Sequence, residues 1–314
     1  MTEQTVDSVE QVLREELVRG DAILASARPI LRHLLANDDT ALFSDEMIAR
    51  IRGMMTHLAA QLLFAQAEAA GADDRAEYVA EREDALAEMM FEDTAFLAHA
   101  HARTIEAQFT ERLQTRSGID AVLSPLVQEL VAAKEADMAA LAMLVLAAQA
   151  RFIQHHRRME LPLRELPGEL FHKALVLLRE QASDDEEVAE AAEQALRADY
   201  DESAGRLGLL TRVVMTMGQK ATRALAIDHA GLAIFGTALA MASRQDRDLT
   251  ILSFADRQFA RLALSLRAAG LKRQAVEEQF LFLHPQVGLP EGFDLLGADR
   301  AAALLAGSHP EPAF

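Results

Sequence analysis

The sequence predicts an all-α protein in which a long antiparallel helical hairpin near the N-terminus is followed by an array of helical pairs. Hydrophobic residues make up 51% of the 314 residues, which is enough for a packed core. Aromatic residues make up only 5%, with no Trp and two Tyr, while Ala and Leu are abundant. This composition is typical of helices packed closely on helices. In most segments the apolar residues also recur with the period of a helix.

The N-terminal segment predicts two short helices. Val9, Leu13 and Leu17 form one stripe, and a second helix runs from residue 23 to 35 after Gly20, ended by the acidic turn 37–40. From Ser44, a suitable N-cap, a longer helix begins, because the next apolar residues follow a 3-4-3-4 spacing. These residues are Ile48, Ile51, Met55, Leu58 and Leu62.

A second long helix is expected after the break at residues 71–74, because residues 75–116 contain neither Pro nor Gly. Its expected inner face consists of Val79, Leu86, Met90, Leu97 and Ile105. The segments 44–71 and 74–116 would then form the antiparallel hairpin. Two helices alone cannot bury both apolar faces, so the hairpin is expected to pair with another copy in a homodimer.

Beyond Ser117 the pattern changes to shorter helices. Four helical pairs open near Asp120, Pro167, Ser203 and Ala255, with a pitch of about 37 to 52 residues, as in two-helix solenoid repeats. The sequence therefore predicts an N-terminal helical bundle or hairpin in residues 1–117, a helical-repeat domain in 118–307 and a flexible tail in 308–314.

Two stretches carry a resemblance to a known group of proteins. Residues 124–180, which include Arg-Arg-Met-Glu-Leu-Pro-Leu-Arg-Glu-Leu-Pro-Gly at 157–168, and residues 259–270 resemble an uncharacterised bacterial family of HEAT-like helical-repeat proteins. The resemblance covers the C-terminal two thirds of the chain and implies a HEAT-like array. Its motifs are helix signatures, so it implies no functional residues.

Charge and composition exclude several classes of partner. With 31 basic and 49 acidic residues the net charge is −18, which repels a phosphate backbone and argues against nucleic acid. The absence of Cys excludes thiol nucleophiles and Cys-ligated metals and fits the cytoplasm. The longest near-apolar runs, 138–148 and 230–242, are shorter than the roughly 20 residues that span a bilayer, so no membrane span is expected.

The densest cationic group is His155-His156-Arg157-Arg158, at the end of an apolar helix that starts near Asp137. It is a candidate anion-binding site, but cationic side chains in a last helical turn also complement the helix dipole. A phosphoacceptor histidine is a third interpretation, because Pro-Leu follows at 162–163 as it follows the histidine of a kinase dimerisation helix. The spacing is one residue longer, however, and no adjacent acid or ATP-binding glycine motif is present.

A second candidate is Asp228-His229, before a glycine-containing apolar helix. Asp228 is expected to be the N-cap and His229 a first-turn residue, where main-chain N–H groups can receive an anion; capping alone also explains the pair. No nucleophile elbow, Walker loop or dinucleotide motif is present, and the single Glu-x-x-His at 169–172 is insufficient for a di-metal site. No catalytic residue, metal or cofactor is therefore expected.

These observations favour binding over chemistry. The leading hypothesis is a non-enzymatic helical scaffold or regulatory adaptor that binds a partner protein, although the sequence does not decide the absence of enzymatic activity. One alternative is a signalling phosphotransfer protein with its acceptor histidine at 155–156. Another is a small-ligand sensor with an apolar pocket beside the helix of residues 230–242.

Overall fold

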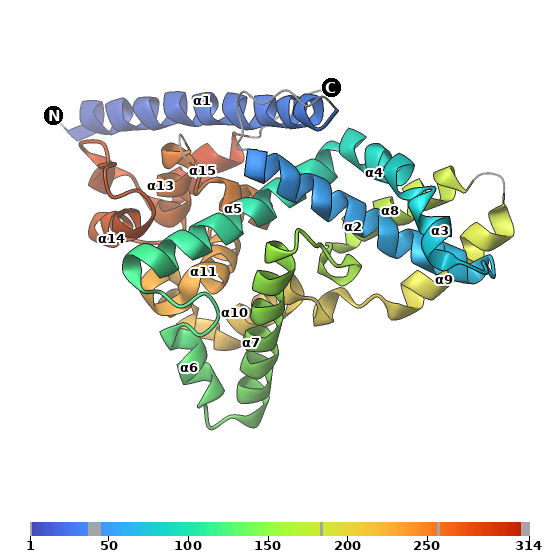
Figure 1. Cartoon of the computed structure of the whole chain (residues 1–314). Coiled ribbons are helices and arrows are strands. Elements are labelled where there is room, and N and C mark those ends of the chain that lie inside the picture. The colour runs from blue at the N-terminus through green and yellow to red at the C-terminus, as the bar shows by residue number, and fades with distance from the viewer. Residues whose placement is uncertain (1, 37–44, 183–184, 256–257, 309–314) are drawn as a thin grey trace. The chain divides into compact units, whose positions relative to one another are not determined.

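The computed structural model describes residues 2–36, 45–182, 185–255 and 258–308. Within these ranges the protein is helical and has no β-strand (Figure 1), which confirms the predicted all-α class. The residues group into two compact units. Unit 1 comprises Met1–Pro29, Ile105–Ala150 and Leu210–Phe314, and unit 2 comprises Ile30–Thr104 and Arg151–Leu209. Each unit combines residues from both sides of residue 117, whereas the predicted domains follow chain order.

The N-terminal segment is one continuous helix, α1 (Thr2–Ala36), so the prediction of two short helices is wrong. A glycine inside a helix costs only about 1 kcal/mol relative to alanine, and Gly20 gains a contact in return: its carbonyl accepts a hydrogen bond from the Gln258 side chain at 2.8 Å. The predicted stripe is correct, because Val9, Leu13 and Leu17 are buried. The expected turn 37–40 and the Ser44 cap lie outside the described residues.

Unit 2 is built around α2 (Asp45–Ala69). The five residues with 3-4-3-4 spacing on this helix are all buried, which confirms the predicted stripe. The helix lies against four others in the same unit (Figure 1). These are α3 (Arg75–Ala80), α4 (Glu83–Glu92), α8 (Gly168–Gln181) and α9 (Glu186–Asp199).

The predicted second long helix is three helices, namely α3, α4 and α5 (Thr94–Ser117). The chain leaves the helical path at residues 81–82 and again at Asp93, whose carboxylate accepts the N–H of Ala95 at 2.7 Å. Such a side-chain acceptor competes with the helical main-chain bond and begins a new helix. The five residues of the predicted inner face are nevertheless buried.

Unit 1 contains the N-terminal part of α1 and most of the helices that follow residue 105. Its core helix is α11 (Ile227–Ser243), which contacts α6, α12, α13, α14 and the 3-10 segment η3. The other elements are α5 (from residue 105), α6 (Pro125–Val131), α7 (Ala136–Arg157, to residue 150), α10 (Arg206–Met217, from residue 210), η3 (Gly218–Leu225), α12 (Arg247–Leu252), α13 (Phe259–Ala268), α14 (Arg273–Leu283), η4 (Phe293–Leu295) and α15 (Ala298–Ala306).

One predicted helix start is wrong. The first helical residue of α11 is Ile227 and its N-cap is Ala226, so Asp228 is the second residue and not the cap. The helical path is interrupted at Gly231, which has φ 70° and ψ 160°. The helix α9 begins at Glu186 with Asp185 as N-cap, whose carboxylate accepts the Val188 N–H at 3.2 Å.

One helix of the described chain, α7, is long and apolar enough to cross a membrane by length and composition alone. It exposes Met143 and Leu144, each at 51% of its surface. Core helices of soluble proteins pass the same criterion, so the expected absence of a membrane span stays a prediction.

Unit 1 contains a buried ion pair between α5 and α12. The Glu106 carboxylate accepts bonds from both terminal nitrogens of Arg247, at 2.9 and 3.1 Å. Its side chain has no exposed surface, and that of Arg247 is 13% exposed. The Arg247 Nε also donates to the Thr237 hydroxyl at 3.0 Å. Two helices that are distant in sequence are therefore joined by a charge pair shielded from water.

Replacing one member of this pair should destabilise the protein strongly. Glu106→Gln leaves a buried guanidinium beside a neutral amide, which costs about 3 to 5 kcal/mol. The control is Glu129→Gln, because Glu129 pairs with Arg223 at the surface, where both side chains are nearly half exposed and such pairs contribute about 1 kcal/mol or less. Urea unfolding of both variants measures the difference. Equal losses would contradict a special role for the buried pair.

Candidate functional site

The segment between α7 and α8 is anchored beside an aromatic ring that contacts two arginines. The Phe152 ring lies 3.9 Å from the guanidinium carbon of Arg206 and 4.5 Å from that of Arg103. Arg206 is fully buried and Arg103 is 3% exposed. Guanidinium groups over an aromatic face are attracted by its quadrupole, and more strongly where water is excluded. This arrangement joins α5, α7 and α10 within unit 2.

A buried carboxylate balances the two cations. Glu165, in the 3-10 turn η1 (Leu163–Glu165), lies 3.6 Å from Arg103 and 3.9 Å from Arg206, and its side chain is 7% exposed. The neighbouring backbone fits closely, because a Cβ on Gly205 would lie 2.5 Å from the Arg164 carbonyl oxygen. Glycine at position 205 therefore permits close packing against η1. Residues 158–166 are thus fixed at their C-terminal end.

The N-terminal end of this segment is a Schellman turn. The Glu160 N–H donates to the His155 carbonyl at 2.9 Å and the Met159 N–H donates to that of His156 at 3.1 Å, the bond pattern that ends many helices. Met159 has φ 60°, a left-handed conformation that costs a residue other than glycine about 1 kcal/mol. The turn directs the chain back over the last turn of α7.

This turn brings an acid to the predicted cluster. The Glu160 carboxylate lies 2.7 Å from His155 Nδ1, and both side chains are about one quarter exposed. The hydrogen bond from His155 lowers the pKa of Glu160, against a smaller opposing effect of burial. The carboxylate is therefore ionised at neutral pH. An acid next to the histidines was not expected from the sequence, because Glu160 is five residues away and no glycine marks the turn.

A third histidine comes from α2. His57 Nδ1 lies 2.9 Å from the Leu161 carbonyl oxygen and 3.2 Å from the Leu161 nitrogen, so this residue holds the ring in either tautomer. Gln61 supports the same backbone: its amide nitrogen donates to the Leu161 carbonyl at 2.9 Å and its oxygen accepts the Leu163 N–H at 3.0 Å. Sequence analysis missed His57 and Gln61, which read as ordinary polar positions of an amphipathic helix.

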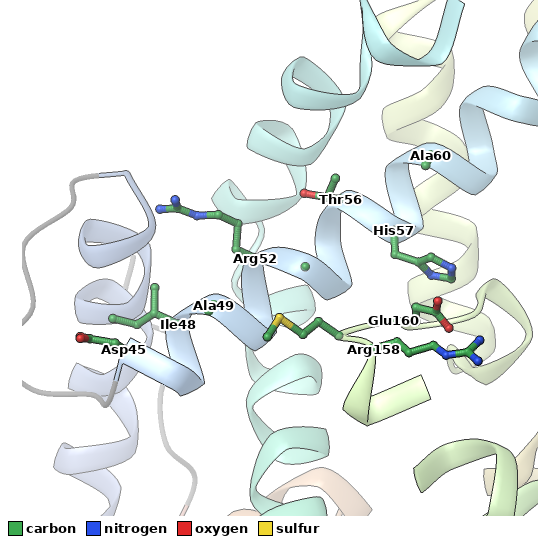
Figure 2. A pocket seen from close by; sticks show the side chains of 11 residues that line it. Asp45, Ile48, Ala49, Arg52, Thr56, His57, Ala60, Arg158 and Glu160 are labelled. Atoms are coloured by element: carbon green, nitrogen blue, oxygen red, sulfur yellow. The ribbon is translucent and has the colours of Figure 1, made fainter. Parts of the chain in front are cut away.

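An open groove of about 690 Å³ lies along α2 and is here named the α2 groove. Its floor is formed by small or apolar side chains of one helix face, and its other side by the turn that carries Arg158 and Glu160 (Figure 2). A Cβ on Gly53 would lie 2.6 Å from the Met159 Cβ, so glycine permits this contact. The floor residues are Ile48, Ala49, Gly53, Thr56 and Ala60.

Charged side chains surround this floor. Arg52 and Asp45 come from α2, and Arg158 and Glu160 from the turn. Figure 2 shows His57 extending from α2 toward the segment that carries Glu160 and Arg158. The groove therefore combines an apolar floor with two guanidinium groups and two carboxylates, one of which is already bonded to His155.

A second cavity, of about 410 Å³, is here named the Tyr200 pocket. Its polar lining includes His57, His155 and Arg164, so His57 lines both cavities. The ring of Tyr200, also in the lining, is stacked on Phe171 with centroids 3.8 Å apart. The Tyr200 hydroxyl donates to the Leu166 carbonyl at 2.8 Å. Burial, with the nearby carboxylates of Glu202 and Asp201, raises the pKa of Tyr200 to about 12, so the phenol stays neutral.

The predicted cluster at the end of α7 is distributed over this region. His155 lines the Tyr200 pocket and Arg158 lines the α2 groove. The His156 ring lies 6.2 Å from that of Phe152, and its carbonyl accepts a bond from Arg50 at 2.9 Å. Arg157 is exposed at the last position of α7. His155 and Arg158 thus reach two neighbouring cavities that share His57.

Asp228 and His229, the other predicted site residues, belong to unit 1. Asp228 is exposed. The His229 Nε2 lies 3.0 Å from Arg223 and 3.8 Å from Glu129, and the His229 N–H donates to the Ala226 carbonyl at 3.2 Å. Its side chain therefore belongs to a small surface charge cluster, and its main-chain N–H is used within the helix start.

Among the described residues, no three acidic or histidine side chains come close enough to hold a metal ion. Comparison with known proteins gives no match: no family model fits the chain, and no curated protein or solved structure matches it. The resemblance to HEAT-like proteins therefore stays a prediction.

The contribution of Glu160 to stability should depend on pH in a defined direction. Because its pKa is lower in the folded protein than the ordinary value of 4.5, the pair with His155 stabilises the fold above that value, and the stabilisation is lost as pH falls through the folded pKa. Glu160→Gln should lower the melting temperature at neutral pH, and the difference from wild type should shrink toward about pH 4.

Melting curves recorded by circular dichroism across this pH range measure the effect. The control is Glu88→Gln, which removes an exposed carboxylate from α4 of the same unit. A constant difference between wild type and Glu160→Gln at every pH would show that the carboxylate does not stabilise the turn through its charge.

Proposed function

We propose that the protein is a non-enzymatic cytoplasmic scaffold or regulatory adaptor, which binds a segment of a partner protein in the α2 groove. The observation that carries the proposal is the groove itself, with about 690 Å³ of open volume over small side chains. Such a floor lets the backbone of an incoming helix approach closely, as in helix-in-groove recognition. The same face continues to Phe64, whose side chain is 46% exposed, so the apolar surface extends beyond the groove.

The charges define the partner. The guanidinium of Arg158 is exposed beside the groove and favours a carboxylate in the bound segment, because guanidinium and carboxylate groups pair in a bidentate geometry. The matching segment is an amphipathic helix with bulky apolar side chains for the floor and an acidic residue at one edge. Charge complementarity of this kind selects the partner more than it adds affinity.

The finer architecture belongs to the same proposal. A hairpin over 44–116 would support self-association as a homodimer, and a HEAT-like array over 118–307 would present further surface to partners. The consecutive helices α8 and α9 contact each other, as do α13 and α14. These two pairs support the array. The burial of the predicted inner faces of 44–71 and 75–116 supports the hairpin.

A charged side chain in the groove should abolish partner binding. Ala49→Glu introduces a carboxylate on the floor, where it blocks the apolar contact and repels an acidic partner. Ala195→Glu makes the same change at an exposed position of α9 outside the groove. Proteins co-purified with wild type and with Ala195→Glu should be missing with Ala49→Glu, and the purified partner should bind Ala49→Glu at least about tenfold more weakly in fluorescence anisotropy, a loss of about 1.4 kcal/mol.

Light scattering on the same variants separates the partner from self-association. If Ala49→Glu converts a dimer to a monomer and still binds the partner, the groove is the dimer contact and the partner site lies elsewhere. Retention of every partner by Ala49→Glu, with no change in oligomeric state, would refute the proposal.

One specific observation favours a second candidate function, phosphotransfer. Glu160 on Nδ1 orients the His155 ring, the arrangement that activates an imidazole through its other nitrogen. Phosphoryl transfer from acetyl phosphate to His155 Nε2 would release acetate and leave an acid-labile phosphate. That label should disappear in His155→Ala and persist in His156→Ala. This candidate would be eliminated if both variants were labelled, or if neither the wild-type protein nor any variant were labelled.

A further inference from the structure

The Tyr200 pocket holds two imidazole rings whose Nδ1 atoms are already used. The His155 Nδ1 is bonded to the Glu160 carboxylate at 2.7 Å, and that of His57 is held by Leu161. Within the described part of the chain, neither ring has a hydrogen bond at Nε2. A fixed ring with an open nitrogen is a preorganised contact, because binding need not order the side chain.

The protonation state of His155 follows from its partner. An ionised carboxylate only accepts hydrogen bonds, so the His155 Nδ1 carries a proton. A ligand carboxylate also only accepts, so its hydrogen bond to Nε2 needs a second proton between the two atoms. Binding of an anion there is therefore coupled to uptake of a proton.

The other charged groups of the pocket are Arg164 of η1 and Asp199 of α9, both exposed. His57 faces the same space from α2, and Glu160 and Arg158 lie on the adjoining turn. The Glu160 carboxylate is paired with His155, and the Arg164 guanidinium can pair with a carboxylate in a bidentate geometry. Arg164 therefore gives this cavity a group that recognises a carboxylate.

Apart from Gln61, the rest of the lining is apolar or aromatic. Pro162 and Leu163 form one part, and Leu196 of α9 lies with the stacked rings of Phe171 and Tyr200. Because the Tyr200 hydroxyl is used by Leu166, this residue presents only its ring. A volume of about 410 Å³ is in the range of small-molecule sites, which combine an apolar wall with a few polar groups that fix orientation.

We infer that the Tyr200 pocket binds a small hydrophobic carboxylic acid, whose carboxylate contacts the Nε2 atoms of His57 and His155 and the Arg164 guanidinium. Its apolar body packs against Leu196 and the Phe171–Tyr200 pair. This site is distinct from the α2 groove, with which it shares only His57 among the lining residues. Its test needs only the purified chain and no partner protein.

The test uses matched acids and amides. Benzoate, phenylacetate, hexanoate and octanoate, with their primary amides, are titrated into the full-length protein by isothermal titration calorimetry. At least one acid should bind with one-to-one stoichiometry, and its amide should bind at least about tenfold more weakly. Repeating the titration in buffers of different ionisation enthalpy should show proton uptake, and the affinity of the acid should fall as pH rises.

Three variants locate the ligand. Arg164→Gln and His155→Gln should each weaken the acid at least about tenfold, and His155→Gln should also reduce the proton uptake. Arg158→Gln removes a guanidinium from the α2 groove but not from this pocket, and should leave the affinity unchanged. Circular dichroism melting curves establish that each variant is folded.

Three results would overturn the inference. The first is no saturable binding by any of the four acids. The second is equal affinity for acid and amide. The third is a loss in Arg158→Gln without a loss in Arg164→Gln, which would place the ligand in the α2 groove. None of these results bears on whether a partner protein binds that groove.

Discussion

The candidate site of unit 2 depends on the burial of two guanidinium groups against one phenylalanine. The Phe152 ring contacts Arg103 and Arg206, and the Glu165 carboxylate lies 3.6 and 3.9 Å from them. Charges removed from water are costly unless they are paired and packed. The fold meets this demand by joining α5, α7, η1 and α10 at one point, and both cavities lie beside the segment that this point holds in place.

The sequence predicts the helical class and most buried faces, because these depend on local composition and period. The stripes of α2 and of residues 75–116 are correct for that reason. It does not predict where helices join or divide. Gly20 lies inside α1 because tertiary contacts compensate for a weak helix former, and Asp93 interrupts a stretch without glycine or proline because its carboxylate captures a main-chain N–H. Both outcomes depend on single polar contacts that no periodic pattern reveals.

The candidate site is recovered only in part for a similar reason. The cationic cluster at 155–158 reaches two cavities, and residue type alone predicts its position. The sequence does not predict the roles of His57, Gln61 and Glu160. His57 and Gln61 lie 104 and 102 residues from the backbone groups that they bind. Glu160 approaches His155 through a left-handed residue that is not glycine. Long-range pairing and a rare backbone conformation lie beyond the reach of sequence spacing.

The contact between Gly53 and Met159 has a consequence for how this sequence can change. The helix carries a glycine where alanine would suit it better, and the turn carries a side chain where glycine would relieve the backbone. Each position is unfavourable alone, yet only one of the two can carry bulk at this distance. Homologous chains that keep the turn are therefore expected to show correlated substitutions at 53 and 159, with a larger residue at one matched by glycine at the other.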